Sequence, residues 1–475
     1  MGRKPIYTSV YNQMKYKIFS GELPIGSPLP PERKLAAELN VSRNTIVRAL
    51  GELEAEGLIT GKMGSGRYVE ALPPVPAISR VDWNDRHAHR SLESSPSHMA
   101  ELLAIADDDP HIINFAHGDG GKRTLATSRL GEYVKAAAER AESYYFTSVK
   151  GLPQLREQLV EWMGMEQISS PEQVCVTSGS QEGLYMLTTL LARPGDAIVT
   201  EMPTYFGSLQ LFTSLGIRII PVPLDDEGMR VDVLEGILAR TQPRFIYTVP
   251  TFHNPTGRTL SLSRRRKLLA LSERYGVPIV EDDAYRHLHL HTEAPPPLKQ
   301  WDAYGNVIYL NTFSKLLFPG LRIGWIAGSR QIIDLVSRLK ELSISTNALG
   351  QIALAAMLAD GALRPHLANA RQHYVLQAKL MESHLDSLRH LGIRYEIPAG
   401  GFYFWIALPE GIEARKLAQR CRAAGVSFAS GDMFLLREVE QPYIRLCYTH
   451  EGEEAIHAGM SILSKTLREL MEETR

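Results

Sequence analysis

The sequence predicts a multi-domain protein in which a small N-terminal domain of helices and a hairpin precedes a larger α/β domain. A length of 475 residues is too great for one compact core. A polar stretch rich in proline and serine, residues 73–110, has the composition of a linker between residues 1–72 and 111–475. Beyond it, short apolar runs alternate with helical patterns, which is typical of a doubly wound, mostly parallel sheet.

Residues 1–72 predict three helices and two short strands. Apolar residues recur at helical spacing between positions 10 and 18, which indicates the first helix. The second helix opens at Pro31 and ends at Asn40, a residue suited to a left-handed cap. Ser42 is a good N-cap for the third helix, so only two residues separate it from the second. Residues 58–69 form two apolar strands around a glycine-rich turn.

Charge and cysteine content narrow the class of protein. The chain carries a net charge of -1, but residues 1–70 carry +3 and the remainder -4, so the small domain is the candidate for binding a polyanion. The three cysteines form no CxxC pair, which predicts neither a disulfide framework nor a metal site. We find no apolar run of membrane-spanning length and no secretion signal, and therefore expect a cytoplasmic protein without a membrane partner.

Four apolar runs of the large domain end in polar groups. They are VCVTSGSQ (174–181), FIYTVPTFHNPTG (245–257), PIVEDDAY (278–285) and NVIYLNTFSK (306–315). Ligands of open parallel sheets bind beyond the carboxyl ends of the strands, so we expect these four groups to meet at one site.

Two of these groups offer a phosphate site and an amine. Ser180 and Gln181 open a helix whose free N–H groups suit a phosphate, and Arg322 could add a charged partner. A simple N-capping turn is the alternative for this segment. Lys315 lies among apolar residues, where desolvation lowers the pKa of an amine as Schiff-base chemistry requires. A solvated surface lysine is its alternative interpretation.

The other two groups offer partners for an aromatic heterocycle. Asp282 would pair with a protonated pyridine nitrogen and make the ring an electron sink, although it could equally cap the next helix. Asn254 and Tyr285 could reach a ring oxygen, though Asn254 by itself suits an ordinary Asn-Pro turn. Tyr205 could stack on the ring or belong to the core. Together with the phosphate cradle and Lys315, these groups predict pyridoxal 5'-phosphate (PLP).

Seven segments in order and spacing resemble the fold-type I aminotransferases of the aminoadipate and kynurenine group, over about residues 110–470. They are TSGSQ, PTYFGS, NPTG, EDDAY, TFSKLLFPGLRIG, AGGFYFWI and IRLCY. The resemblance implies Lys315 as the PLP Schiff-base lysine and Arg445 as the partner of a substrate or effector carboxylate. It further implies a small subdomain from about residue 345 and a set of cofactor contacts, namely Ser180, Gln181, Tyr205, Asn254, Asp282, Tyr285, Thr312, Ser314 and Arg322. One position departs, because Phe146 stands where the family usually has a tyrosine that reaches the partner's phosphate.

The first 70 residues resemble the winged-helix DNA-binding domain of GntR-type bacterial regulators, through GELPIGSPLPPERKLAAELNVSRNTIVRALGELEAEGLI. In helix-turn-helix proteins the start of the second motif helix reads base edges in the major groove. The expected DNA contacts are Arg33, Ser42, Arg43, Asn44, Thr45, Arg48 and, in the wing, Gly64, Gly66 and Arg67. A helical module for protein binding is the alternative interpretation.

The combination of the two domains resembles the MocR subfamily of transcriptional regulators. It implies a homodimer swapped head to tail, operator DNA as a partner, and an aminotransferase-like domain that senses an amino compound or PLP. Two alternatives stay open. The protein could be an active aminotransferase of the aminoadipate or kynurenine type that carries a DNA-binding domain, or a binding module without PLP in which Lys315 is idle.

Overall fold

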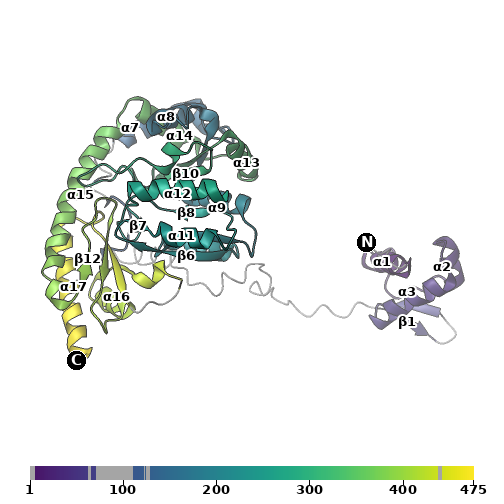
Figure 1. The fold of residues 1–475 in the computed structure, drawn as a ribbon. Coiled ribbons are helices and arrows are strands. Elements are labelled where there is room, and N and C mark those ends of the chain that lie inside the picture. Colours follow the sequence, from purple (N-terminus) through teal and green to yellow (C-terminus); the bar gives the residue numbers. More distant parts are fainter. Residues whose placement is uncertain are drawn as a thin grey trace. The chain divides into compact units, whose positions relative to one another are not determined.

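The computed structural model describes residues 6–62, 66–70, 111–121, 124, 129–436 and 441–474. The chain divides into two compact units, Met1–Ala88 and His89–Arg475, and each is described by itself. The expected linker, residues 73–110, and the wing residue Gly64 lie outside the described residues. Figure 1 shows the two units with their elements labelled.

The small unit has the three helices and the hairpin that the sequence predicts. Ser42 accepts a hydrogen bond from the backbone N–H of Thr45, and Asn40 adopts a positive φ of 50° at the end of the second helix. Ile46, Leu50 and Leu53 are buried against the first helix and the hairpin. The elements are α1 (Ile6–Phe19), α2 (Glu32–Glu38), α3 (Arg43–Ala55), β1 (Ile59–Lys62) and β2 (Gly66–Val69).

An eight-stranded sheet forms the centre of the large unit. Its order is β4-β11-β10-β9-β8-β5-β6-β7, and only β11 and β7 run antiparallel to their neighbours. The predicted mostly parallel sheet is therefore confirmed. The strands are β4 (Val174–Thr177), β5 (Ala197–Met202), β6 (Arg218–Asp225), β7 (Gly228–Met229), β8 (Ile246–Thr248), β9 (Ile279–Asp282), β10 (Val307–Thr312) and β11 (Gly324–Ala327).

Helices bury both faces of this sheet. Consecutive strand residues alternate between two cores, so that Ile198 belongs to one and Val199 to the other, as do Val280 and Ile279. A strand buried on both faces is mostly apolar, which explains the near-continuous apolar runs in the sequence. The helices of this part are α7 (Leu130–Ala138), α8 (Pro153–Met163), α9 (Ser180–Leu191), α10 (Phe206–Ser214), α11 (Val231–Leu238), α12 (Leu262–Tyr275), α13 (Arg330–Lys340) and α14 (Ala348–Ala359).

The C-terminal part adds a four-stranded antiparallel sheet, ordered β12-β13-β16-β15. Figure 1 shows the long helices α15 and α17 side by side along this part of the unit. A short parallel pair, β3 with β14, ties residues near 113 to the C-terminal part. The elements are β3 (Ile113–Asn114), α15 (Leu363–Asp386), β12 (Arg394–Tyr395), β13 (Tyr403–Ala407), α16 (Ala414–Ala423), β14 (Val426–Ser427), β15 (Ala429–Ser430), β16 (Tyr443–Cys447) and α17 (Glu453–Thr474).

Within the described part of the chain, we find no helix that is both long and apolar enough to cross a membrane. Cys175, Cys421 and Cys447 are all buried and unpaired with one another.

Candidate functional site

A cavity of about 570 Å³ lies where β4, β8, β9 and β10 end. The convergence expected for a doubly wound sheet is therefore present. The cavity is lined by every residue that the sequence proposed for the cofactor or for a carboxylate, namely Ser180, Gln181, Tyr205, Asn254, Asp282, Tyr285, Thr312, Ser314, Lys315, Arg322 and Arg445. The individual roles of these residues remain predictions, and their geometry is described next.

The turn between β4 and α9 approaches two other segments closely. Gly179 has a φ of 94°, and a Cβ atom there would lie 2.9 Å from Nη2 of Arg322. Arg322 itself has a left-handed φ of 53°, and its Nη2 donates to the carbonyl of Ser178 at 2.5 Å. Glycine at 324 is equally constrained, because a Cβ there would lie 2.8 Å from the backbone nitrogen of Ser180. The start of α9 and a guanidinium thus face one corner of the cavity, which suits a phosphate.

Lys315 follows β10 and is held by a backbone oxygen. Its Nζ donates to the carbonyl of Gly118 at 2.7 Å. Burial lowers the pKa of this amine below its ordinary value, as does the charge of Arg445, while Asp119 opposes the shift. Beside it, the hydroxyl of Thr312 donates to that of Ser314 at 2.9 Å. A lysine whose pKa is lowered by burial is suited to nucleophilic attack on a carbonyl.

Asp282, the last residue of β9, is a buried carboxylate that is only partly satisfied. Its Oδ2 accepts a hydrogen bond from the hydroxyl of Tyr247 at 3.0 Å, and its Oδ1 has no hydrogen-bond partner among the described residues. Burial raises the pKa of Asp282 to about 6, against the hydrogen bond from Tyr247 and the charge of Lys315. A bound group that donates an N–H to Oδ1 would remove this cost of burial.

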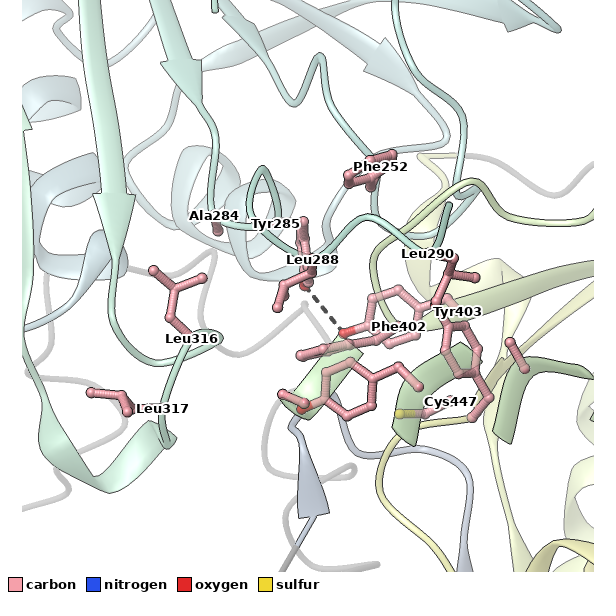
Figure 2. Close-up of a cluster of buried hydrophobic side chains, with 14 of the residues drawn as sticks. Phe252, Ala284, Tyr285, Leu288, Leu290, Leu316, Leu317, Phe402, Tyr403 and Cys447 are labelled. Atoms are coloured by element: carbon pink, nitrogen blue, oxygen red, sulfur yellow. Dashed lines mark hydrogen bonds between the residues drawn. The ribbon is translucent and has the colours of Figure 1, made fainter. Parts of the chain in front are cut away.

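Two hydroxyls and an amide connect the large sheet to the C-terminal sheet. Nδ2 of Asn254 donates to the hydroxyl of Tyr285 at 3.3 Å, and that hydroxyl lies 3.2 Å from the hydroxyl of Tyr403. Figure 2 shows this contact as a dashed line, with Leu288 and Phe402 packed around it. Tyr403 begins β13, so the C-terminal sheet closes one side of the cavity.

Arg445 lies in β16 and is 2% exposed. Its two terminal nitrogens donate to Oδ1 of Asn254 at 3.0 Å and to the carbonyl of Ala116 at 2.6 Å. The guanidinium also lies 4.1 Å from the ring centroid of Tyr403. No carboxylate pairs with it among the described residues, so a ligand carboxylate could take the place of the neutral acceptors.

The sequence did not identify the residues of the segment before α7 that line the cavity. His117, Gly118 and Asp119 all do so, and Nδ1 of His450 lies 2.5 Å from Oδ1 of Asp119. Although burial disfavours its charge, Asp119 has its pKa lowered to about 2 by His450. These residues come from a loop and from beyond β16, and no strand pattern or helix start marks them in the sequence. Tyr247 and Tyr403 were missed because each reads as an ordinary core aromatic.

In the small unit, the proposed DNA-contacting residues that the structure describes lie on α2, on α3 with its N-cap, and on β2. Arg33, Ser42, Asn44 and Arg48 are exposed, Thr45 is half-buried, and Arg48 lies over the ring of Tyr7 at 3.9 Å.

Glu32 connects the recognition helix to the wing. Its carboxylate accepts from Nε of Arg43 at 3.0 Å and from Nη1 of Arg67 at 2.8 Å. The hydrogen bonds from Arg67 and Arg43 lower the pKa of Glu32. Arg43 and Arg67 are thus positioned together, next to Gly66 at the start of β2.

Comparisons with known proteins assign each of the two units to a protein family. Residues 111–459 match the family described as aminotransferase class I and II, and residues 6–69 match the bacterial regulatory proteins of the gntR family. The uncharacterized HTH-type transcriptional regulator YdfD of Bacillus subtilis is 30% identical over 99% of this chain and 98% of its own length. Aromatic-amino-acid aminotransferase 1 of Thermococcus litoralis is 34% identical over 82% of this chain and 96% of its own.

Solved structures agree with the sequence comparisons. The α-aminoadipate aminotransferase LysN of Thermus thermophilus, complexed with N-(5'-phosphopyridoxyl)-L-leucine, has a TM-score of 0.77 and 30% identity over 82% of this chain and 100% of its own. The kynurenine aminotransferase of Pyrococcus horikoshii, in complex with PMP, has a TM-score of 0.75 and 33% identity over 82% of this chain and 98% of its own.

The fold and the cavity therefore define a protein of the fold-type I, PLP-dependent class. The chain belongs to the class I and II aminotransferase family and joins that domain to a GntR-type winged helix, the architecture of HTH-type transcriptional regulators such as YdfD.

PLP is its cofactor, and the residues present fit that group. Asp282 offers a buried oxygen without a partner, Lys315 an amine, and the start of α9 with Arg322 a phosphate cradle. When bound, PLP supplies an electron sink for the amino group that it carries.

Borohydride reduction of the PLP-loaded protein tests the role of Lys315. We expect mass spectrometry to find the cofactor on Lys315, because this amine is the one that lines the cavity. Lys315→Ala should lose the covalent link and retain the fold by circular dichroism, whereas the exposed control Lys465→Ala should change neither. Cofactor on another lysine, or on none, would refute the assignment.

Gly324→Ala tests the phosphate cradle. The added methyl would meet backbone atoms of Gly179 and Ser180 at 2.7 and 2.8 Å, so the start of α9 must move. Overpacking of this kind costs about 1–3 kcal/mol, and we expect PLP affinity, measured by fluorescence titration, to fall about tenfold. Gly131→Ala is the control, because no atom lies within 4 Å of a Cβ built there. If Gly324→Ala bound PLP with unchanged affinity, the assignment of the start of α9 as the phosphate site would be wrong.

Operator binding tests the recognition helix. We expect Arg43→Ala to lose about 1–3 kcal/mol of binding to an operator found by genomic footprinting, because base contacts carry specificity. Arg67→Ala should weaken binding to all sequences alike and lower the salt slope by about one. Arg468→Ala, which changes an exposed arginine of the large unit, is the control in electrophoretic mobility shifts at several salt concentrations. If Arg43→Ala lost the same binding free energy on operator DNA as on random DNA, Arg43 would not contribute to base recognition.

Proposed function

We propose that this protein is a MocR-type transcriptional regulator whose aminotransferase-like domain senses a small amino compound or PLP itself. One observation carries the proposal: a single chain holds both a GntR-type helix-turn-helix unit and a cavity lined by every residue proposed to contact PLP. The similarity to YdfD, which extends over nearly the whole of both chains, supports the regulatory role. We assign the protein to the cytoplasm, where it would meet operator DNA.

In this proposal Lys315 carries the cofactor, Asp282 accepts the pyridine N–H, and Asn254 with Tyr285 contacts the ring oxygen. Tyr205 lies against the ring, and Ser180, Gln181, Thr312, Ser314 and Arg322 hold the phosphate. All of these side chains line one cavity, which supports the assignments. The amide of Gln181 already donates to the carbonyl of Gly207 at 3.0 Å, so it is held at the edge of the cradle.

A small ligand needs only different affinities for two states of the protein to act as an effector. An effector with a carboxylate would pair with Arg445, whose terminal nitrogens contact the neutral oxygens of Asn254 and Ala116. That pairing would release Asn254, which also contacts Tyr285. The effector site and the cofactor contacts are therefore joined through one amide.

We propose a homodimer, swapped head to tail, as the form that binds the operator. Tyr145 and Phe146 are 73% and 80% exposed, an unusual exposure for neighbouring aromatics and one typical of a surface that a second copy covers. Phe146 offers no hydroxyl to a phosphate of the partner subunit.

A working aminotransferase is the second candidate, because Lys315, Asp282 and Arg445 are all present in the cavity. The aminotransferases of Thermococcus litoralis and Pyrococcus horikoshii match this chain over 82% of its length. The winged helix and Phe146 favour the regulator.

Turnover and operator affinity, measured on the same preparation with a panel of amino acids, separate the two functions. We expect operator affinity to change with at least one amino compound or with PLP, and transamination to be slow or to stop after one half-reaction. Arg445→Ala should abolish the response to a carboxylated effector while PLP and basal DNA binding remain. The exposed Arg338→Ala is the control. The aminotransferase function would be favoured by turnover above about 1 per second together with an operator affinity that no amino compound and no addition of PLP changes.

A further inference from the structure

A second cavity, of about 600 Å³, lies in the large unit and shares no lining residue with the cofactor cavity. Three segments line it. They are the end of α8 at Trp162, the segment that follows β9 over residues 286–294, and the first turns of α15 over residues 364–371. A volume of this size matches pockets for small molecules, which are typically about 300–1,000 Å³.

Three guanidinium groups line this cavity. Arg286 contacts Asp283 at 3.6 Å and donates to the carbonyl of Pro295 at 2.7 Å. Arg364 lies over the ring of Trp162 at 5.2 Å, and Arg371 donates to the carbonyl of His287 at 3.3 Å.

Negative charge is scarce around these groups. Among the residues that the structure describes, neither Arg364 nor Arg371 forms an ion pair, and Glu293 is the only carboxylate that lines the cavity. The cavity therefore concentrates positive charge against few acidic groups, which favours an anionic ligand.

Neutral hydrogen-bond donors add to this arrangement. Burial and the charges of Arg286, Arg371 and Arg364 lower the pKa of His287 to about 3, so its imidazole is neutral at physiological pH. Burial likewise lowers the pKa of His289. The indole Nε1 of Trp162 is buried and has no acceptor among the described residues. Guanidinium and indole groups only donate, and a neutral imidazole offers one donor and one acceptor nitrogen, so donors outnumber acceptors among these side chains.

We propose that this cavity binds a small organic polyanion, a phosphate ester or a polycarboxylate with at least two negative charges, through Arg286, Arg364 and Arg371. Such a ligand would supply the anionic partners that Arg364 and Arg371 do not have among the described residues, and guanidinium groups pair with both carboxylates and phosphates in bidentate fashion. The proposal stands on this cavity alone and does not depend on the proposed function.

The location of the cavity predicts how binding is detected. Arg286 lies just beyond Tyr285, and the same segment pairs with the C-terminal part through Leu290 N–H to the carbonyl of Ala399 at 2.9 Å. A ligand that contacts Arg286 and Arg371 together would hold α15 against this segment. A ligand that binds only the folded state raises the stability of the unit that binds it.

Pyrophosphate and citrate are the probes, each titrated by calorimetry into the full-length protein saturated with PLP, so that the cofactor cavity is filled. We expect one molecule of at least one probe to bind per chain and to raise the thermal transition. Binding of pyrophosphate alone identifies a phosphate site, and binding of citrate alone a polycarboxylate site. If neither probe binds at millimolar concentration, the proposal is wrong.

Paired variants locate the binding. Arg364→Ala/Arg371→Ala should weaken binding at least about tenfold, since the variant removes two guanidinium groups that donate charge-assisted hydrogen bonds to the anion. The matched control Arg338→Ala/Arg468→Ala removes two exposed arginines elsewhere and should bind as the parent does. Glu293→Gln, an exposed change that preserves the fold, should tighten binding severalfold. Equal affinity in all these variants would place the anion elsewhere and overturn the proposal.

Discussion

The parallel direction of β4, β8, β9 and β10 is the constraint on which the chemistry of this protein depends. Because these strands run the same way, their carboxyl ends meet at one edge of the sheet. Residues as distant in sequence as Ser180 and Lys315 therefore line one cavity. Each of these strands is buried on both faces, so most of its side chains are apolar and its polar residues gather toward the carboxyl end.

The C-terminal sheet completes the site from the other side. Arg445 and Tyr403 lie on neighbouring strands of this sheet, and each contacts a residue that follows a strand of the large sheet, Asn254 and Tyr285 respectively. These contacts form a buried polar network between two sheets with different strand directions. Separating the two sheets would leave the partners of these buried hydrogen bonds unpaired, so the network holds the sheets against each other.

In the small unit, hydrogen bonds between side chains also fix the positions of functional groups, here the guanidinium groups of Arg43 and Arg67. Ser42 caps α3, and Glu32 from α2 holds Arg43 and Arg67, so the helix start and the wing present their charges from fixed positions. The salt bridges involved are exposed or half-exposed, and such pairs contribute little to the free energy of folding. Their effect is on where the guanidinium groups lie.

Local sequence signals were enough to predict most of the elements and the proposed cofactor residues that line the cavity. Helix caps such as Ser42, the apolar spacing of α1 and the polar ends of β9 and β10 are local signals, and local signals can be read without a structure. Only the tertiary structure brought His117, Gly118, Asp119 and His450 to Lys315, because these residues lie on loops whose path depends on packing between distant segments. The same holds for the second cavity, where Arg286 and Arg371 are 85 positions apart in sequence and meet only because α15 packs beside the segment after β9.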